Sequence, residues 1–393
     1  MSVQSIREKI NLALYDSKEG VLSLFKVGSF LVASLILSLL IYQFGFNPNL
    51  TVKAWILIAI KASFVFYIVK YLTNLLYSYK PTRFIKDSWF EGLLLLLILI
   101  NGVTYLISNE SLLNWLGRQL EFDQLENFYI LFLQSYFFIL VGIELGKAST
   151  HLTLLKMSPP KMLISSFIFL ILIGTGLLMM PEMTSQIEYM PFFDALFTSI
   201  SASCVTGLIV VDTATYFTQK GHTVLMLLIQ LGGLNIISFA TLLALFSKKG
   251  IGIKHQTILQ DNFSSESLLS GKGLLGKIFL FSFFMEFIGM IALYFTWNPG
   301  TKAPLLEDQF FFSLFHSVSA FNNAGFSLFS NGLQNHVVQN AYSMHLILAA
   351  LIFFGAVGFP VIDDVFNMNR IKKSFKSSLY KLKLSTRISL YTT

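Results

Sequence analysis

Apolar residues occur along this chain in long uninterrupted runs, separated by short polar segments. A helix needs about 20 apolar residues to cross the hydrocarbon layer of a bilayer. The pattern therefore predicts an all-α polytopic membrane protein with about eight transmembrane helices. We expect these helices at residues 27–46, 53–76, 90–108, 126–146, 161–181, 222–246, 275–297 and 343–365.

The composition supports this class and excludes others. Of the 393 residues, 54% are hydrophobic and only 12% are charged, whereas about a quarter of a soluble domain is charged. A single cysteine, Cys204, excludes a disulfide scaffold. The six histidines have no metal-ligand spacing, and no glycine-rich phosphate loop follows a strand. We therefore expect no enzyme, no cofactor and no transition-metal site.

The positive charges indicate an orientation in the membrane. With the N-terminus inside, the inner segments hold 22 Lys and Arg residues and the outer segments hold four. An excess of Lys and Arg marks the cytoplasmic loops of membrane proteins. Both termini are expected in the cytoplasm, and this topology explains the net charge of +7 without nucleic-acid binding.

One segment is repeated. FDALFTSISASCVTGL at 193–208 and FFSLFHSVSAFNNAGF at 311–326 share seven of sixteen residues at a constant offset of 118. Each copy follows one apolar run and precedes another, and is too short to cross the membrane. Each begins as an apolar half-helix, from Phe192 to about Ala202 and from Phe310 to about Ala320, and ends in a short stretch closed by glycine. The sequence thus predicts two re-entrant helix–P-loop–helix repeats, because such backbone is tolerated at membrane depth only when buried or lining a cavity.

The glycine-ended stretches are the candidate ion filter. Glycine allows backbone angles that turn successive carbonyls toward one axis, and a ring of carbonyls can replace the hydration shell of K⁺. For Cys204 the alternatives are a reactive thiol or a small packing residue. Asn322 and Asn323 either brace the loop by hydrogen bonds or offer side-chain oxygens. The candidate filter residues are Cys204, Val205, Thr206, Gly207, Asn322, Asn323, Ala324 and Gly325.

These motifs carry a family resemblance. SISASCVTGLIVVDT and SVSAFNNAGFSLF resemble the first two pore loops of the Trk/Ktr/HKT potassium-transporter superfamily. The runs LLIQLGGLNIISFATLLALF and LILAALIFFGAVGFPVIDDV resemble the helices that follow those loops. The resemblance implies a TrkH/KtrB-like membrane subunit for uptake of potassium, or sodium, across the bacterial inner membrane. It also implies a homodimer and a cytosolic nucleotide-binding regulatory subunit.

The resemblance also suggests a domain organisation. The family has four pore repeats, and two are found here, as expected for an N-terminal half. Two alternatives stay open: a two-repeat cation channel that needs two chains per pore, and a non-transporting membrane scaffold. The expected parts are a four-span region at 1–150, pore repeats at 151–262 and 263–370, and a cytoplasmic linker at 371–393 toward a third repeat.

Several residues within the spans need an explanation. Glu286 and Lys61 are intramembrane charges, and such charges are usually functional or paired. A pair between them is one hypothesis. His316 aligns with Thr198 and is expected to pack or form a hydrogen bond on its half-helix. Four glycines either permit close helix packing or form a hinge: Gly232, Gly233, Gly355 and Gly358.

The predicted inner surface is basic. Lys248, Lys249, Lys254 and the tail from Arg370 to Arg387 offer docking positions for a regulatory subunit. The alternative is an orientation signal combined with contact to anionic membrane lipid.

Overall fold

The computed structural model describes residues 17–79, 81–89, 159–186, 189–246, 271–296 and 309–357, with isolated positions between 91 and 104 and Tyr391. Within these ranges the regular structure is helical, apart from one isolated bridge between Thr184 and Phe217. The all-α prediction is confirmed. The chain forms two compact units, Met1–Lys156 and Met157–Thr393.

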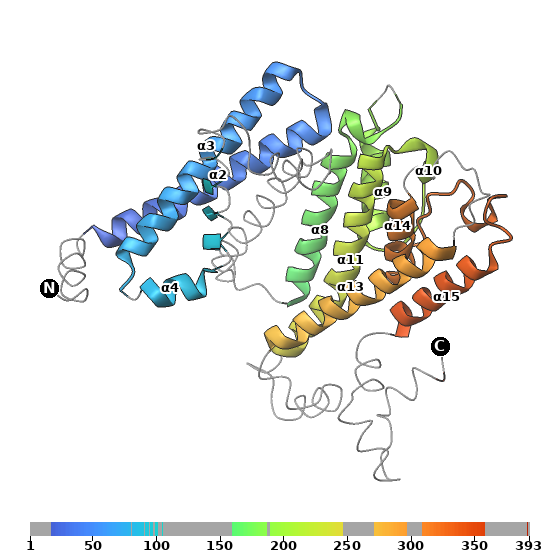
Figure 1. Ribbon diagram of the computed structural model, residues 1–393. Helices are drawn as coiled ribbons and strands as arrows, with labels where there is room; N and C mark the ends of the chain where they lie inside the picture. The colour runs from blue at the N-terminus through green and yellow to red at the C-terminus, as the bar shows by residue number, and fades with distance from the viewer. Residues whose placement is uncertain are drawn as a thin grey trace, which may run out of the picture. The chain divides into compact units, whose positions relative to one another are not determined.

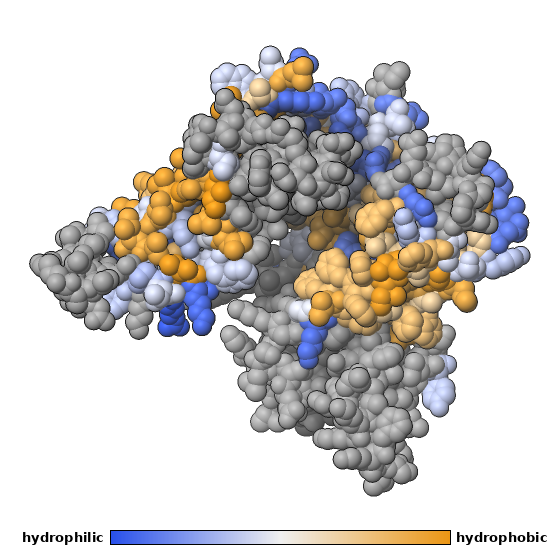
Figure 2. All heavy atoms as spheres, viewed as in Figure 1, coloured by the Kyte–Doolittle hydropathy of each residue, from blue (hydrophilic) through white to orange (hydrophobic). Residues whose placement is uncertain are grey.

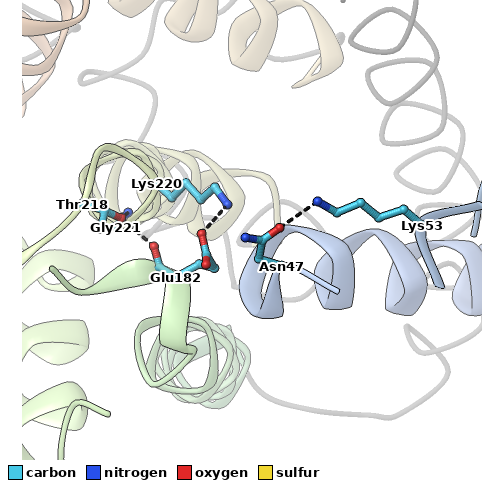
Figure 3. A network of polar contacts seen from close by, with 6 residues as sticks. All are labelled: Asn47, Lys53, Glu182, Thr218, Lys220 and Gly221. Carbon is cyan, nitrogen blue, oxygen red and sulfur yellow. Dashed lines mark hydrogen bonds and ion pairs between the residues drawn. The ribbon is translucent and has the colours of Figure 1, made fainter. Parts of the chain in front are cut away.

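The first unit contains a helical hairpin (Figure 1). The turn forms because Asn47 adopts a left-handed conformation, with φ of 42°, directly after the first helix. Lys53 Nζ donates to Asn47 Oδ1 at 2.8 Å across this turn (Figure 3). Between the helices Tyr67 is buried and its hydroxyl donates to the Ser29 carbonyl at 3.1 Å. The helices of this unit are α2 (Lys18–Phe46), α3 (Leu50–Tyr77) and α4 (Pro81–Asp87).

The second unit contains two groups of helices. In the first group α8, α9 and α11 pack on one another; in the second, α13, α14 and α15 do the same. Helix α11 also contacts α13 and α14, so it joins the groups. The elements are α8 (Pro159–Leu178), η1 (Pro181–Met183), α9 (Phe192–Ser203), α10 (Thr213–Tyr216), α11 (Gln219–Phe246), α13 (Gly271–Thr296), α14 (Gln309–Phe321), η5 (Gly332–Gln334) and α15 (Tyr342–Val357).

Several helices are suited to a bilayer. Helices α2 and α3 and residues Gly276–Thr296 of α13 are long and apolar enough to cross a membrane, while Leu163–Leu178 and Tyr342–Val357 are shorter apolar helices. Large apolar side chains are exposed on α13, where Figure 2 shows an orange surface; Leu280 is 72% exposed. Such an exposed apolar face is suited to contact with membrane lipid. The predicted spans at 90–108 and 126–146 lie largely or wholly outside the described residues.

The connection between α8 and α11 is held by polar contacts (Figure 3). Glu182 and Lys220 form an ion pair at 2.9 Å. Thr218 Oγ1 donates to the Glu182 carbonyl at 2.6 Å and accepts from the Gly221 N–H at 3.3 Å. Further on, His222 Nε2 donates to the Thr213 carbonyl at 2.6 Å. These bonds fix the start of α11 and so the position of the helix that packs behind α9.

Candidate functional site: two equivalent loops

The half-helices α9 and α14 end in the same helix cap. Residues Cys204–Gly207, here the first loop, follow α9, and residues Asn322–Gly325, the second loop, follow α14. In each, two N–H groups fold back on helix carbonyls in the pattern of a Schellman motif. The bonds run from Val205 to Ala202 (3.2 Å) and Thr206 to Ser201 (2.8 Å), and from Asn323 to Ala320 (3.0 Å) and Ala324 to Ser319 (2.8 Å).

Both loops have left-handed backbone at the same two points. Val205 and Asn323 have φ of 55° and 59°, and Gly207 and Gly325 have φ of 78° and 73°. Asparagine and glycine tolerate such angles, but a β-branched valine is a genuine outlier. Strain of this kind costs of order 1–3 kcal/mol and persists only where the surroundings impose it. The shared conformation is therefore a property that the fold maintains in both repeats.

The two loops lie against each other. A Cβ added to Gly207 would collide with the Ala324 carbonyl oxygen, and one added to Gly325 would lie 3.5 Å from the Gly207 Cα. A cavity of about 380 Å³ is lined by both of these glycines together with Asp212 and Phe329. The structure thus brings together the two stretches that the sequence predicted as a filter.

The helices around each loop make equivalent contacts. Ser199 Oγ donates to the Ile171 carbonyl at 2.8 Å, and Ser317 Oγ donates to the Glu286 carbonyl at 2.7 Å. Ser199 faces Gly174 and Ser317 faces Gly289, in each case a glycine of the preceding helix. A Cβ at either glycine would collide with the serine hydroxyl and with a leucine of the following helix. Glu286 therefore occupies in the second repeat the place that Ile171 occupies in the first.

Three of the four candidate hinge glycines lie directly behind the loops. A Cβ at Gly232 would collide with the Ser203 carbonyl oxygen, and one at Gly355 with the Phe321 carbonyl oxygen. These carbonyls belong to equivalent residues at the ends of α9 and α14. A Cβ at Gly233 would collide with Asn322 Oδ1. This geometry supports the close-packing interpretation, while the hinge stays a prediction and Gly358 lies outside the described residues.

The two charges that the sequence predicts within spans lie in different units. Lys61 is on the exposed side of α3 in the first unit. Glu286 is on α13 in the second unit, is 3% exposed, and accepts a hydrogen bond from Asn322 Nδ2 at 3.1 Å. The pair between Glu286 and Lys61 stays a hypothesis. Glu286 nevertheless has a polar partner, and that partner belongs to the second loop.

Side chains brace the second loop. Asn322 Nδ2 also lies 3.2 Å from Gln230 Oε1. His316 Nδ1 donates to the Phe312 carbonyl at 2.9 Å, and its Nε2 accepts from the Leu328 N–H at 3.2 Å. The bracing interpretation of Asn322 fits these contacts, and His316 both packs and forms hydrogen bonds. Gln230 was missed in the sequence, although a lone amide in the apolar run LLIQLGG is a signal that could have found it.

The thiol Cys204 is exposed at the start of the first loop. It does not fill a packing position in the described part of the chain, because burial would be needed for that. Within the same described residues, no group of three His, Cys, Asp or Glu side chains could hold a metal ion.

A family comparison identifies the chain. The model of the family described as TrkH, cation transport protein, matches residues 129–391, more than half of the chain and including both loops. The chain belongs to the TrkH family. The description of this family is one of transport and not of catalysis, in agreement with the sequence prediction. The apolar helices of the structure also agree with a polytopic membrane protein of this family.

Similarity to individual proteins supports the assignment to the TrkH family. The Ktr system potassium uptake protein B of Bacillus subtilis is 39% identical over 223 residues, which are 55% of this chain and 47% of the relative. Its counterpart in Vibrio alginolyticus is 34% identical over 238 residues, 61% of this chain and 50% of the relative. The potassium/sodium uptake protein NtpJ of Enterococcus hirae is 34% identical over 218 residues, 56% of this chain and 47% of the relative. The chain thus spans about half the length of the curated relatives that it matches.

Proposed function

We propose that the chain is a membrane subunit that lets K⁺, or Na⁺, cross the bacterial inner membrane, and that both loops contribute backbone carbonyls to its selectivity filter. The observation that carries the proposal is the repeated loop itself: the same cap and the same left-handed glycine, placed side by side. Relatives named as potassium or potassium/sodium uptake proteins support it.

The half-helices add an electrostatic argument. Helices α9 and α14 both run into a loop at their C-terminal ends. A helix carries a partial negative charge at this end, which favours a cation. Carbonyl oxygens in the loop then replace part of the hydration shell. In this mechanism the chain lowers the cost of dehydrating the ion and takes no part in covalent chemistry, so no cofactor is required.

Sequence features and the names of relatives support the proposed setting of the subunit. The excess of Lys and Arg on one side supports cytoplasmic termini. Relatives named as components of a Ktr system support a protein that works with other subunits. We extend this to a homodimer, bounded by membrane lipid, that docks a cytosolic nucleotide-binding regulatory subunit on its basic inner surface.

The function is tested by complementation. The protein, expressed from its complete gene, should rescue a potassium-uptake-deficient bacterium at low external K⁺. Gly207→Val should abolish rescue, because glycine angles are needed there and a side chain would collide with Ala324. Gly276→Val is the control, since a Cβ at Gly276 meets nothing within 4 Å. Equal rescue by wild type and Gly207→Val at equal membrane abundance would contradict the filter.

The orientation is tested by thiol labelling in a Cys204→Ser background, because Cys204 is itself an exposed thiol. A cysteine at Asn49 or Lys302 should react with a membrane-impermeant reagent applied to intact cells. A cysteine at Lys249 or Lys373 should react only after the cells are opened. The reverse pattern would overturn the proposed topology.

A further inference from the structure

Glu286 makes two contacts with the element that carries the second loop. Its backbone carbonyl accepts from Ser317 Oγ at 2.7 Å, and its carboxylate Oε1 accepts from Asn322 Nδ2 at 3.1 Å. Ser317 lies within α14, and Asn322 is the first residue of the loop. One residue of α13 thus holds α14 at its middle and at its end.

The first repeat has only one of these contacts. Ile171 occupies the equivalent place there, and its carbonyl accepts from Ser199 Oγ at 2.8 Å. Its side chain is a hydrocarbon, and the residue equivalent to Asn322 is Cys204. The backbone contact is therefore shared by both repeats, whereas the contact from carboxylate to loop is specific to the second.

Burying a carboxylate in this region is costly. Glu286 is only 3% exposed. An ionisable side chain within a membrane span is expensive and is usually tied to function. Simple packing does not need one, since isoleucine fills the equivalent place in the first repeat. Asn322 Nδ2 has two N–H groups and lies near three acceptors: the Val318 carbonyl at 3.0 Å, Glu286 Oε1 at 3.1 Å and Gln230 Oε1 at 3.2 Å. The amide is therefore placed between helices of both groups.

We propose that Glu286 is a positioning residue for the selectivity filter: its buried carboxylate holds the Asn322 amide and thereby sets where the carbonyls of the second loop lie. This inference rests on the proposed function. A hydrogen bond in a buried region is electrostatically stronger than one in water, because the local dielectric constant is low. Loosening this contact should therefore impair ion discrimination rather than abolish expression.

The test compares Glu286→Gln, Glu286→Ile and Asn322→Ala in the protein expressed from its complete gene. Glutamine keeps the size and one acceptor oxygen, and isoleucine is the residue found at the equivalent place in the first repeat. We expect the KM for K⁺ to rise about threefold in Glu286→Gln and about tenfold in Glu286→Ile, with a fall in the ratio of K⁺ to Na⁺ uptake. Glu19→Gln is the matched control, because it makes the same chemical change at an exposed glutamate of α2, in the other compact unit.

A double-mutant cycle separates positioning from general stability. If Glu286 acts through Asn322, then Glu286→Ile should change the uptake ratio no further in an Asn322→Ala background. Additive changes, or an unaltered KM and uptake ratio in Glu286→Gln, would overturn the inference. Gly207→Ala is measured alongside. A strong effect there with none at Glu286 would reject only the positioning role, whereas no effect at Gly207 would reject the filter itself.

Discussion

Ser201 and Ser319 occupy the same point of the same helix cap, yet of their two hydroxyl groups only that of Ser319 has a hydrogen-bond partner among the described residues. Ser319 Oγ donates to the Phe326 carbonyl at 2.7 Å, whereas Ser201 Oγ is buried without a partner. One helical turn earlier in each half-helix, the side chains show the same contrast between a bonded and an unbonded group. His316 holds the Leu328 N–H, while the equivalent Thr198 Oγ1 is again buried without a partner in the described part of the chain.

The residues that follow each loop also differ between the two repeats, here in their exposed fraction. Leu208 is 59% exposed and Val210 is 46% exposed. Their equivalents in the second repeat, Phe326 and Leu328, are 3% and 4% exposed. The cap and the glycine thus define the backbone of both loops, while among the described residues side-chain hydrogen bonds at these equivalent positions are made only in the second repeat. This difference predicts that equivalent substitutions will have unequal effects, except where they touch the shared backbone.

The largest effect is expected at the two loop glycines. Gly207→Ala should reduce initial rates of Rb⁺ uptake to background, because it combines a left-handed φ with a collision against the Ala324 carbonyl. Gly325→Ala meets only the strained φ, worth about 1–2 kcal/mol, and should retain part of the rate. Uptake is measured in a potassium-uptake-deficient bacterium with protein amounts matched. Equal rates in the two variants would show that the loops do not differ in crowding.

The glycines behind the loops should instead behave alike. Gly232→Ala and Gly355→Ala each force a Cβ onto the last carbonyl of a half-helix. Overpacking of this kind costs about 1–3 kcal/mol. Both variants should lower the midpoint of thermal unfolding in detergent to a similar extent. Gly176→Ala on α8, where a Cβ meets nothing within 4 Å, is the control and should not lower it. A lowered midpoint in only one of the pair would contradict the equivalence of the repeats.

The backbone of the loops could be predicted from sequence because the repeat is strongest there. The half-helix expected from Phe192 to about Ala202 is observed as Phe192–Ser203, and the one expected from Phe310 to about Ala320 as Gln309–Phe321. The residue-by-residue match of the flanking helices, such as that of Glu286 with Ile171, was missed because the spacing changes. Ile171 and Ser199 are 28 residues apart, but Glu286 and Ser317 are 31 apart. A comparison at constant offset cannot detect such a shift.

The side-chain bracing could not be predicted for a different reason. Ser201 and Ser319 are identical and lie in matching sequence, so no local pattern separates the bonded hydroxyl from the unbonded one. The difference arises because Phe326 turns inward and brings its carbonyl to Ser319, while Leu208 remains exposed. Such contacts depend on tertiary packing, as does the position of Gln230, which meets Asn322 from 92 residues away.

A smaller effect is expected at His316 and Thr198. His316→Thr places the residue of the first repeat in the second and leaves the Leu328 N–H without its acceptor. A buried group left unsatisfied costs about 1–3 kcal/mol. Thr198→Val removes a buried hydroxyl that has no partner within the described residues and should be neutral or stabilising. The measurement is again the unfolding midpoint in detergent. Destabilisation by Thr198→Val equal to that by His316→Thr would show that both loops are braced.

The smallest effect is the most direct test of the comparison, because it uses one substitution at two equivalent places. Ser319→Ala removes the donor to the Phe326 carbonyl and should destabilise the protein by about 1 kcal/mol, the net value of a typical hydrogen bond. Ser201→Ala removes a hydroxyl that is buried without a partner among the described residues, so the same loss of an oxygen atom should relieve a desolvation penalty. The two variants should therefore shift the unfolding midpoint in opposite directions. Because the residue removed, the residue introduced and the position in the cap are identical, helix propensity and volume cancel between them. A fall of equal size in both would mean that Ser201 has a bond of its own and that the two loops are secured alike.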